Sequence, residues 1–210
     1  MADTKTPLEE DRFYHIYNHA VGNERLFSSE KNYLHFLKLC DKYLSGFVDV
    51  YAYCLMPNHF HFIIKVKSLE EIMITDVALR GLQTPRRADG VFQNIDIPKI
   101  ISKQFSHLFN SYAQAYNKQQ NRKGSLFNNR YKRKQITTDA YLVNLIHYIH
   151  YNPIEANLCN SISDWKYSSY NAILSGKNTS IARDDIINLF TDKQNFIYCH
   201  NVAPKISGIE

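Results

Sequence analysis

The stretch that most constrains this chain of 210 residues is a strand, a tight turn and a second strand between Val48 and Val66. From Val48 to Cys54, side chains of two kinds alternate with the period of two that a half-buried strand shows. Pro57 and Asn58 supply the turn, because proline presets φ and asparagine tolerates left-handed backbone. The sequence therefore predicts a β-hairpin here.

The second strand of this hairpin carries two histidines. Because side chains alternate across a strand, His59 and His61 share one face, while Phe60, Phe62 and Ile64 share the other. Neutral imidazole is the commonest protein ligand for divalent metals, and two ligands on a rigid strand lose little freedom on binding. The pattern indicates a metal-binding pair, and the alternative is two surface histidines that fall two residues apart by chance.

Length and composition favour one domain with a full core. No run approaches 18 apolar residues, so we expect no membrane span. The start of the chain is polar and acidic, unlike a secretory signal, and we expect a cytoplasmic protein. The four cysteines are scattered without a paired motif, which is typical of reduced thiols.

Positive charge is concentrated in one tract. The net charge is +5, yet between Lys99 and Thr138 there are nine Lys and Arg residues and no acidic one. Basic residues interleaved with aromatic ones suit a groove that follows a nucleic-acid backbone and stacks on unpaired bases, whereas the alternative is a solvated basic face. The residues that we predict to bind DNA are Arg122, Lys123, Phe127, Arg130, Tyr131, Lys132, Arg133 and Lys134.

The remaining elements follow from periodicity and capping signals. A strand at 13–20, a helix that begins near Ser28 or Ser29 and ends at Gly46, and then the hairpin form the opening half of a split βαβ arrangement. We expect a short helix from Ser68, a helix at about 98–120, a basic strand or extended loop at 125–136 and a helix from Thr138. The domain boundaries that we predict are a flexible start at 1–12, one domain at 13–175 with an inserted loop at 80–96, and a C-terminal extension at 176–210.

Tyr148 and Asn152 stand four residues apart on the last predicted helix. At this spacing a phenol and a carboxamide share one helix face. Over a sheet that carries His59 and His61, they would add a nucleophile and an oxygen ligand, and three protein ligands with open positions are typical of a catalytic metal site. Alternatively, Tyr148 is a half-buried aromatic, and Asn152 caps a following helix that has Pro153 at its first position.

Four motifs in this order resemble those of the single-tyrosine HUH transposases, closest to the REP-associated tyrosine transposases. The resemblance covers about residues 13–170, which is most of the chain. The motifs are Pro57-Asn58-His59-Phe60-His61, the segment from Gly124 to Lys132, the segment from His147 to Ile154, and the segment from Asp164 to Tyr170.

This resemblance implies an α+β fold, with an antiparallel sheet and helices on one face, similar to the RRM or ferredoxin-like plan. It implies that His59 and His61 hold Mg²⁺ or Mn²⁺, that Asn152 is a third ligand and that Tyr148 is the nucleophile. The implied activity is that of a metal-dependent endonuclease and strand transferase on single-stranded or hairpin DNA, acting through a 5′-phosphotyrosine. Members can be monomers or homodimers.

Two other functions are compatible with the same residues. A domesticated relative could keep the fold and bind nucleic acid without catalysis. A small metallohydrolase could use the histidine pair with a water nucleophile, and it would then remain active without the Tyr148 hydroxyl. Tyr141 is the most serious alternative nucleophile, since it lies two turns earlier on nearly the same helix face; Tyr112 and Tyr151 are the others.

Overall fold

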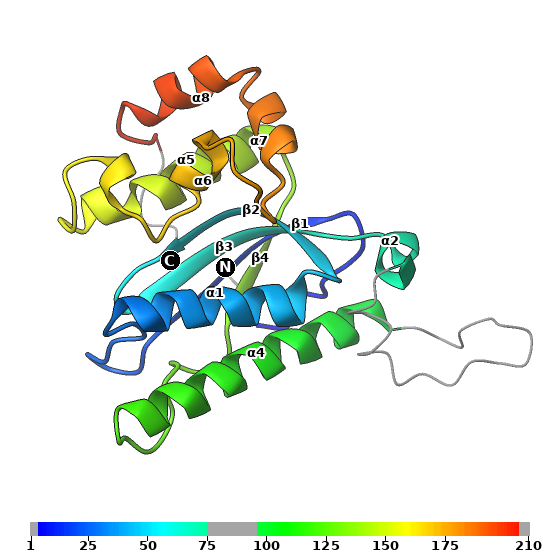
Figure 1. Cartoon of the computed structure of the whole chain (residues 1–210). Coiled ribbons are helices and arrows are strands. Elements are labelled where there is room, and N and C mark those ends of the chain that lie inside the picture. The colour runs from blue at the N-terminus through cyan, green and yellow to red at the C-terminus, as the bar shows by residue number, and fades with distance from the viewer. Residues whose placement is uncertain (1–3, 75–95, 206–210) are drawn as a thin grey trace, which may run out of the picture.

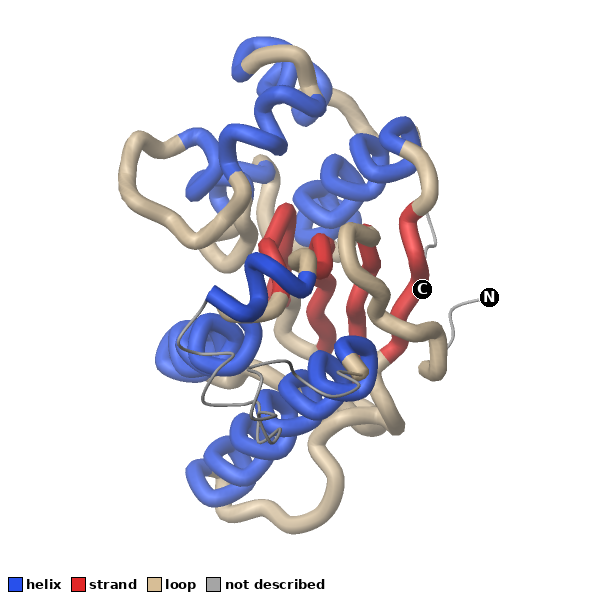
Figure 2. The backbone as a smooth tube through the Cα atoms, turned by 90° about the vertical axis from the view of Figure 1, so that its right-hand side faces the viewer, coloured by secondary structure: helices blue, strands red, loops and turns tan. Residues whose placement is uncertain are grey.

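The computed structural model describes residues 4–74 and 96–205. A four-stranded sheet lies at the centre of the molecule, between two layers of helices (Figures 1 and 2). In chain order the elements are β1 (Phe13–His19), α1 (Glu30–Leu44), β2 (Val48–Leu55), β3 (His59–Val66), α2 (Leu69–Ile74), α4 (Ile97–Gln119), β4 (Lys132–Ile136), α5 (Asp139–Glu155), the 3-10 turn η1 (Ile162–Asp164), α6 (Tyr170–Leu174), α7 (Arg183–Leu189) and α8 (Lys193–His200).

The strands lie in the order β2-β3-β1-β4, and each neighbouring pair is antiparallel. This order is the ferredoxin-like one, so the predicted α+β class and the split βαβ start are confirmed. The β2–β3 hairpin closes at the predicted turn, where the Met56 N–H donates to the His59 carbonyl at 2.9 Å. The order places β1 and β3 at the centre of the sheet and β4 at one edge.

Helices α1 and α4 cover one face of the sheet. Helix α1 begins after Ser29, as predicted, where the Ser29 N–H donates to the Asn32 side chain at 3.0 Å. Its apolar stripe packs with that of α4 on the side chains that β1 and β3 turn to this face. The residues at the centre of this core are Ile16, Phe36, Phe60, Phe62, Phe105 and Tyr112.

The prediction placed helices on one face, and the structure adds α5 to α8 on the other (Figure 1). The physical reason is that β2 and β3 also turn apolar side chains, such as Cys54 and Ile63, to this second face, and that surface must be buried. Leu145 and Ile149 of α5 and Phe196 of α8 pack over it. The described part of the predicted extension at 176–210 is therefore an integral part of the second core.

The ends and the insertion also differ from expectation. The predicted flexible start at 1–12 is wrong for its described end, because Leu8 is fully buried and the Asp11 N–H donates to the Val66 carbonyl at 3.0 Å. Of the predicted loop at 80–96, only Asp96 lies within the described residues, where it caps α4 by accepting from the Lys99 N–H at 3.0 Å. None of the described helices is long and apolar enough to cross a membrane.

Candidate active site

A row of aromatic rings, most of them imidazoles, lies across β1 and β3 on the sheet face under α5. β3 contributes His59 and His61, and β1 contributes His15, Tyr17 and His19 from the alternate positions that share this face. The register pairs Tyr17 with His61 and His19 with His59. The His19 and His59 rings stack with centroids 4.8 Å apart, and the His15 and His61 rings with centroids 5.1 Å apart. The rigid sheet thus fixes these rings in position.

Helix α5 places Tyr148 and Asn152 over this row of rings. The helix begins after Thr138, as predicted, and Tyr148 and Asn152, one turn apart, share a buried face. The Tyr148 ring lies edge-on to the His61 ring with centroids 6.4 Å apart. The Asn152 Nδ2 lies 3.2 Å from the His61 Nε2. The structure therefore brings Tyr148, Asn152, His61 and, next to His61, His59 into one cluster.

Asn152 is not the cap of a new helix. Helix α5 continues through Pro153 to Glu155, and the Ala156 N–H donates to the Asn152 carbonyl at 2.9 Å. Pro153 lies in the last turn of α5, so the hydrogen bond that a proline cannot donate and the kink that it causes affect only the end of the helix. The capping interpretation of Asn152 is wrong, and its side chain is free to face the sheet.

Hydrogen bonds hold both candidate ligand imidazoles by their Nδ1 atoms. His59 Nδ1 lies 2.8 Å from the side-chain oxygen of Asn58, so Nδ1 carries the proton and Nε2 keeps its lone pair. His61 Nδ1 lies 2.9 Å from His15 Nε2, while its own Nε2 faces Asn152. Metal-ligating histidines commonly donate their second ring N–H to such a partner, which fixes the tautomer and the ring orientation.

The donors present fit one divalent ion. Within residues 4–74 and 96–205, no group of three or more His, Cys, Asp and Glu side chains is arranged to hold a metal. The side chains that would hold an ion here are those of His59, His61 and Asn152, and the Asn152 oxygen and nitrogen exchange places when its amide turns over. Neighbouring ligands of one octahedral ion with bonds of about 2.1 Å lie about 3 Å apart. The 3.2 Å between Asn152 and His61 Nε2 agrees with that spacing.

The site residues predicted from the sequence do not include the β1 half of this site. His15, Tyr17 and His19 recur at every second position of a segment that was predicted as a strand, and this spacing is the signal that could have found them. The Tyr17 ring stacks on the His15 ring with centroids 4.6 Å apart. His15 is the most informative of the three, since it contacts a candidate ligand directly.

The basic residues of β4 divide between the two faces of the sheet. Lys132 pairs with Tyr17 and Lys134 with His15, so both lie on the face of Tyr148, and both are exposed. The Lys132 Nζ lies 5.4 Å above the centre of the Tyr17 ring. The Lys134 Nζ donates to the Tyr141 hydroxyl at 3.1 Å. The rim of the candidate site beside β4 therefore carries positive charge.

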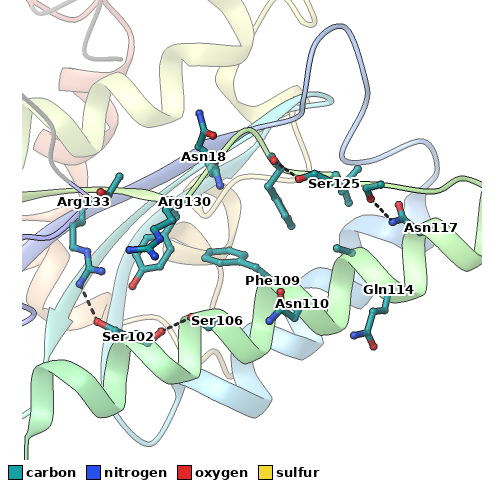
Figure 3. A pocket seen from close by; sticks show the side chains of 17 residues that line it. Asn18, Ser102, Ser106, Phe109, Asn110, Gln114, Asn117, Ser125, Arg130 and Arg133 are labelled. Atoms are coloured by element: carbon teal, nitrogen blue, oxygen red, sulfur yellow. Dashed lines mark hydrogen bonds between the residues drawn. The ribbon is translucent and has the colours of Figure 1, made fainter.

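Arg133 and Arg130 lie on the opposite side, beside α4 (Figure 3). Arg133 pairs with Ile16, is almost buried, and donates to the Ser102 hydroxyl at 3.0 Å. Lys123 and Arg130 are exposed. Arg122 makes contacts within the protein: its guanidinium donates to the Asn117 side chain at 2.6 Å and forms an ion pair with a Glu24 oxygen at 3.3 Å.

Phe127 and Tyr131 do not form stacking platforms for bases. Their side chains are only 8% and 7% exposed and belong to the core under α4. Each ring packs on Phe109 with centroids 5.3 Å apart. That prediction is wrong because the edge of this core needs large apolar side chains, which these two aromatics supply.

The other candidate tyrosines differ in place from Tyr148. Tyr112 lies in the core on the far side of the sheet, where its hydroxyl donates to the Leu26 carbonyl at 2.5 Å. Tyr141 is half-buried and bonded to Lys134, and Tyr151 packs against His147. Tyr148, 4% exposed, contacts the His61 ring from α5, and Tyr17 of β1 stacks on the same ring with centroids 5.8 Å apart.

Comparison with known proteins gives two relatives, and no family model matches. A protein of Haemophilus influenzae that carries the name REP-associated tyrosine transposase is 25% identical over 122 residues, which are 58% of each chain. A solved structure of the REP-associated tyrosine transposase bound to a REP hairpin superposes with a TM-score of 0.51 and 14% identity, covering 89% of this chain and 93% of that one. The chain is similar to REP-associated tyrosine transposases. The predicted resemblance is thereby confirmed, and the solved REP-associated transposase shows the fold.

Proposed function

We propose that this chain is a metal-dependent single-stranded DNA endonuclease and strand transferase that uses Tyr148 as its nucleophile. The observation that carries the proposal is the convergence of the Tyr148 ring and the Asn152 amide of α5 on His61 of β3. A tyrosine that only fills the core, or an asparagine that only caps a helix, would have no reason to lie over two imidazoles. The solved relative is bound to a REP hairpin, which supports hairpin DNA as the substrate.

In the proposed reaction the Tyr148 Oη attacks the phosphorus of a phosphodiester. The new O–P bond forms as the P–O3′ bond breaks, the phenolic proton passes to solvent, and O3′ takes up a proton and leaves as a 3′-hydroxyl. The product is a 5′-phosphotyrosine, and attack by a 3′-hydroxyl in the reverse sense rejoins DNA without ATP. A divalent ion bound by His59, His61 and Asn152 would stabilise negative charge on the non-bridging oxygens.

The chain's own residues supply binding and orientation. His15 and Asn58 orient the two candidate ligand imidazoles through their Nδ1 atoms. Lys132 and Lys134 lie on the face of Tyr148 at the edge of the sheet, where they would attract the phosphate backbone.

The Tyr148→Phe variant tests the proposal. It removes one oxygen and keeps the ring, so the variant should fold and bind DNA and Mn²⁺ as the wild type does. It should form no covalent adduct on a denaturing gel and cleave no hairpin or single-stranded oligonucleotide. Tyr141→Phe, in the same helix, is the matched control and should retain both activities.

Three results would overturn the assignment. Continued cleavage by Tyr148→Phe would indicate a hydrolase that uses water. An adducted peptide that mass spectrometry maps to any residue other than Tyr148 would move the nucleophile elsewhere. Absence of adduct and cleavage from the wild type would favour a protein that binds nucleic acid without catalysis.

A further inference from the structure

A groove of about 620 Å³ lies between α4 and the segment 124–133, which we call the α4 groove (Figure 3). It is on the sheet face opposite Tyr148, because Arg133, which lines it, pairs with Ile16 of the first core. The segment is fixed to α4 at both ends. Asn117 Nδ2 donates to the Gly124 carbonyl at 2.9 Å, and Arg133 donates to the Ser102 hydroxyl at 3.0 Å. The groove therefore has two rigid walls.

The α4 wall of this groove is polar but uncharged. Its side chains recur every four residues, which places them in one row along the helix; they are Ser102, Ser106, Asn110 and Gln114. Asn110 and Gln114 are exposed, and neither side chain makes a hydrogen bond within the part of the chain that the structure describes. No acidic side chain lines the groove among the described residues.

The opposite wall and the floor complete a surface suited to bases. Arg130 is exposed on the segment wall, Asn18 and Asn129 add two more amides, and the Phe109 ring lies between the walls. An amide presents a donor beside an acceptor, the pattern that base edges match, and arginine pairs with guanine or phosphate. An acidic peptide would match the arginines but not the row of neutral amides. Unpaired bases have their Watson–Crick edges available, whereas those of a duplex do not.

We propose that the α4 groove binds unpaired nucleotides of the DNA substrate and reads their base edges through Asn110 and Gln114. This inference rests on the proposed function only in that the ligand is DNA. The edge strand β4 joins the two sites, because Arg133 lies on the groove side and Lys132 and Lys134 on the Tyr148 side. A DNA strand that leaves the groove over β4 meets positive charge on both faces of the sheet.

The experiment compares two double variants of the full chain. N110A/Q114A removes the two unbonded amides from exposed helix positions, where alanine favours the helix. N188A/Q194A removes two exposed amides from α7 and α8, beyond the other face of the sheet, and is the matched control. The probes are a short random-sequence single-stranded oligonucleotide and a blunt duplex of the same length. Fluorescence anisotropy gives the affinities, and sequencing of the bound random pool gives the base preference.

N110A/Q114A should bind the single strand about tenfold or more weakly and should lose the base preference, since a good bidentate contact discriminates by that order. Its affinity for the duplex, and both affinities of the control, should match the wild type. Three results would overturn the proposed nucleotide site in the groove. They are an unchanged base preference, an equal loss of duplex binding, and displacement of the single strand by polyglutamate as effectively as by DNA. Adduct formation at Tyr148 is measured separately, so failure of the groove and failure of the proposed function are distinguishable.

Discussion

At the scale of single residues, His61 has the most contacts of the candidate ligands. Its Nδ1 meets His15, its Nε2 meets Asn152, and its ring meets Tyr148. If Nε2 is the metal ligand, Nδ1 carries the proton and donates to His15 Nε2, which fixes the tautomer of His15 as well. His15 is then a positioning residue for the ligand.

Replacing His15 tests this role. His15→Phe keeps a ring that can stack on Tyr17 but removes the acceptor, so the Mn²⁺ concentration for half-maximal cleavage should rise about 10- to 100-fold. His15→Gln offers an amide acceptor and should recover part of the loss. Both variants should bind single-stranded DNA as the wild type does. An unchanged Mn²⁺ dependence of His15→Phe would show that His15 only fills space.

The ligand assignment has its own test. His59→Ala and His61→Asn should each abolish Mg²⁺- or Mn²⁺-dependent cleavage and leave DNA binding largely intact, since the basic residues of β4 are untouched. His19→Ala removes the ring that stacks on His59 but no proposed ligand, and it should retain cleavage. Undiminished cleavage by both ligand variants would remove the metal site.

Residue spacing predicted which groups meet at this site but not how they are held. The periods of strand and helix place His59 with His61 and Tyr148 with Asn152, and the structure brings the two pairs together. That His15 supports His61 depends on the register between β1 and β3, which no local pattern contains. The same limit explains Phe127, because burial depends on what α4 packs against it.

At the scale of elements, β4 is an edge strand that serves both faces of the sheet. Only Lys132–Ile136 of the predicted segment at 125–136 is strand, and the rest forms the wall of the α4 groove. Composition could not separate these two parts, because the basic residues continue through both. Within the strand, side chains alternate between the two faces of the sheet, so Lys132 and Lys134 are exposed and Arg133 is buried.

This alternation predicts different effects of charge removal. K132Q/K134Q should reduce the slope of log affinity against log salt for single-stranded DNA by about 1.4 units, since each phosphate contact on a single strand contributes about 0.7. Arg133→Gln should change the slope less but lower the melting temperature, because it loses the Ser102 hydrogen bond and the packing of its guanidinium 4.9 Å from the Tyr131 ring centre. Titration across salt and thermal unfolding measure the two effects. Equal slopes for wild type and K132Q/K134Q would place these lysines outside the DNA contact.

At the scale of the whole molecule, a buried histidine chain joins α8 to the helix that carries Tyr148. His200 Nδ1 donates to the Phe196 carbonyl at 2.7 Å, so its Nε2 accepts from His150 Nδ1 at 2.9 Å. His150 Nε2 lies 2.7 Å from the Ser169 Oγ, which also has the Tyr53 carbonyl as an acceptor at 3.3 Å. Burial lowers the pKa of both histidines, so both rings are neutral in the folded protein. The chain links α8 to the second core.

Acid should therefore weaken the fold through His200. Burial lowers the pKa of His200 to about 3, from an ordinary value of about 6.5 in the unfolded chain. Between these values the unfolded chain binds the extra proton, so the stabilisation is complete above about pH 6.5 and is lost as the pH falls toward 3. The cost is about 1.4 kcal/mol of unfolding free energy for each pH unit in this window. Denaturant unfolding at about pH 8, above this window, and at about pH 6.5, 5.5 and 5, in its upper half, measures the loss. His200→Asn should be less stable at pH 8 but lose less stability on acidification, whereas His35→Asn, at an exposed position of α1, should follow the wild type. Parallel pH dependences for wild type and His200→Asn would show that His200 does not carry the acid sensitivity.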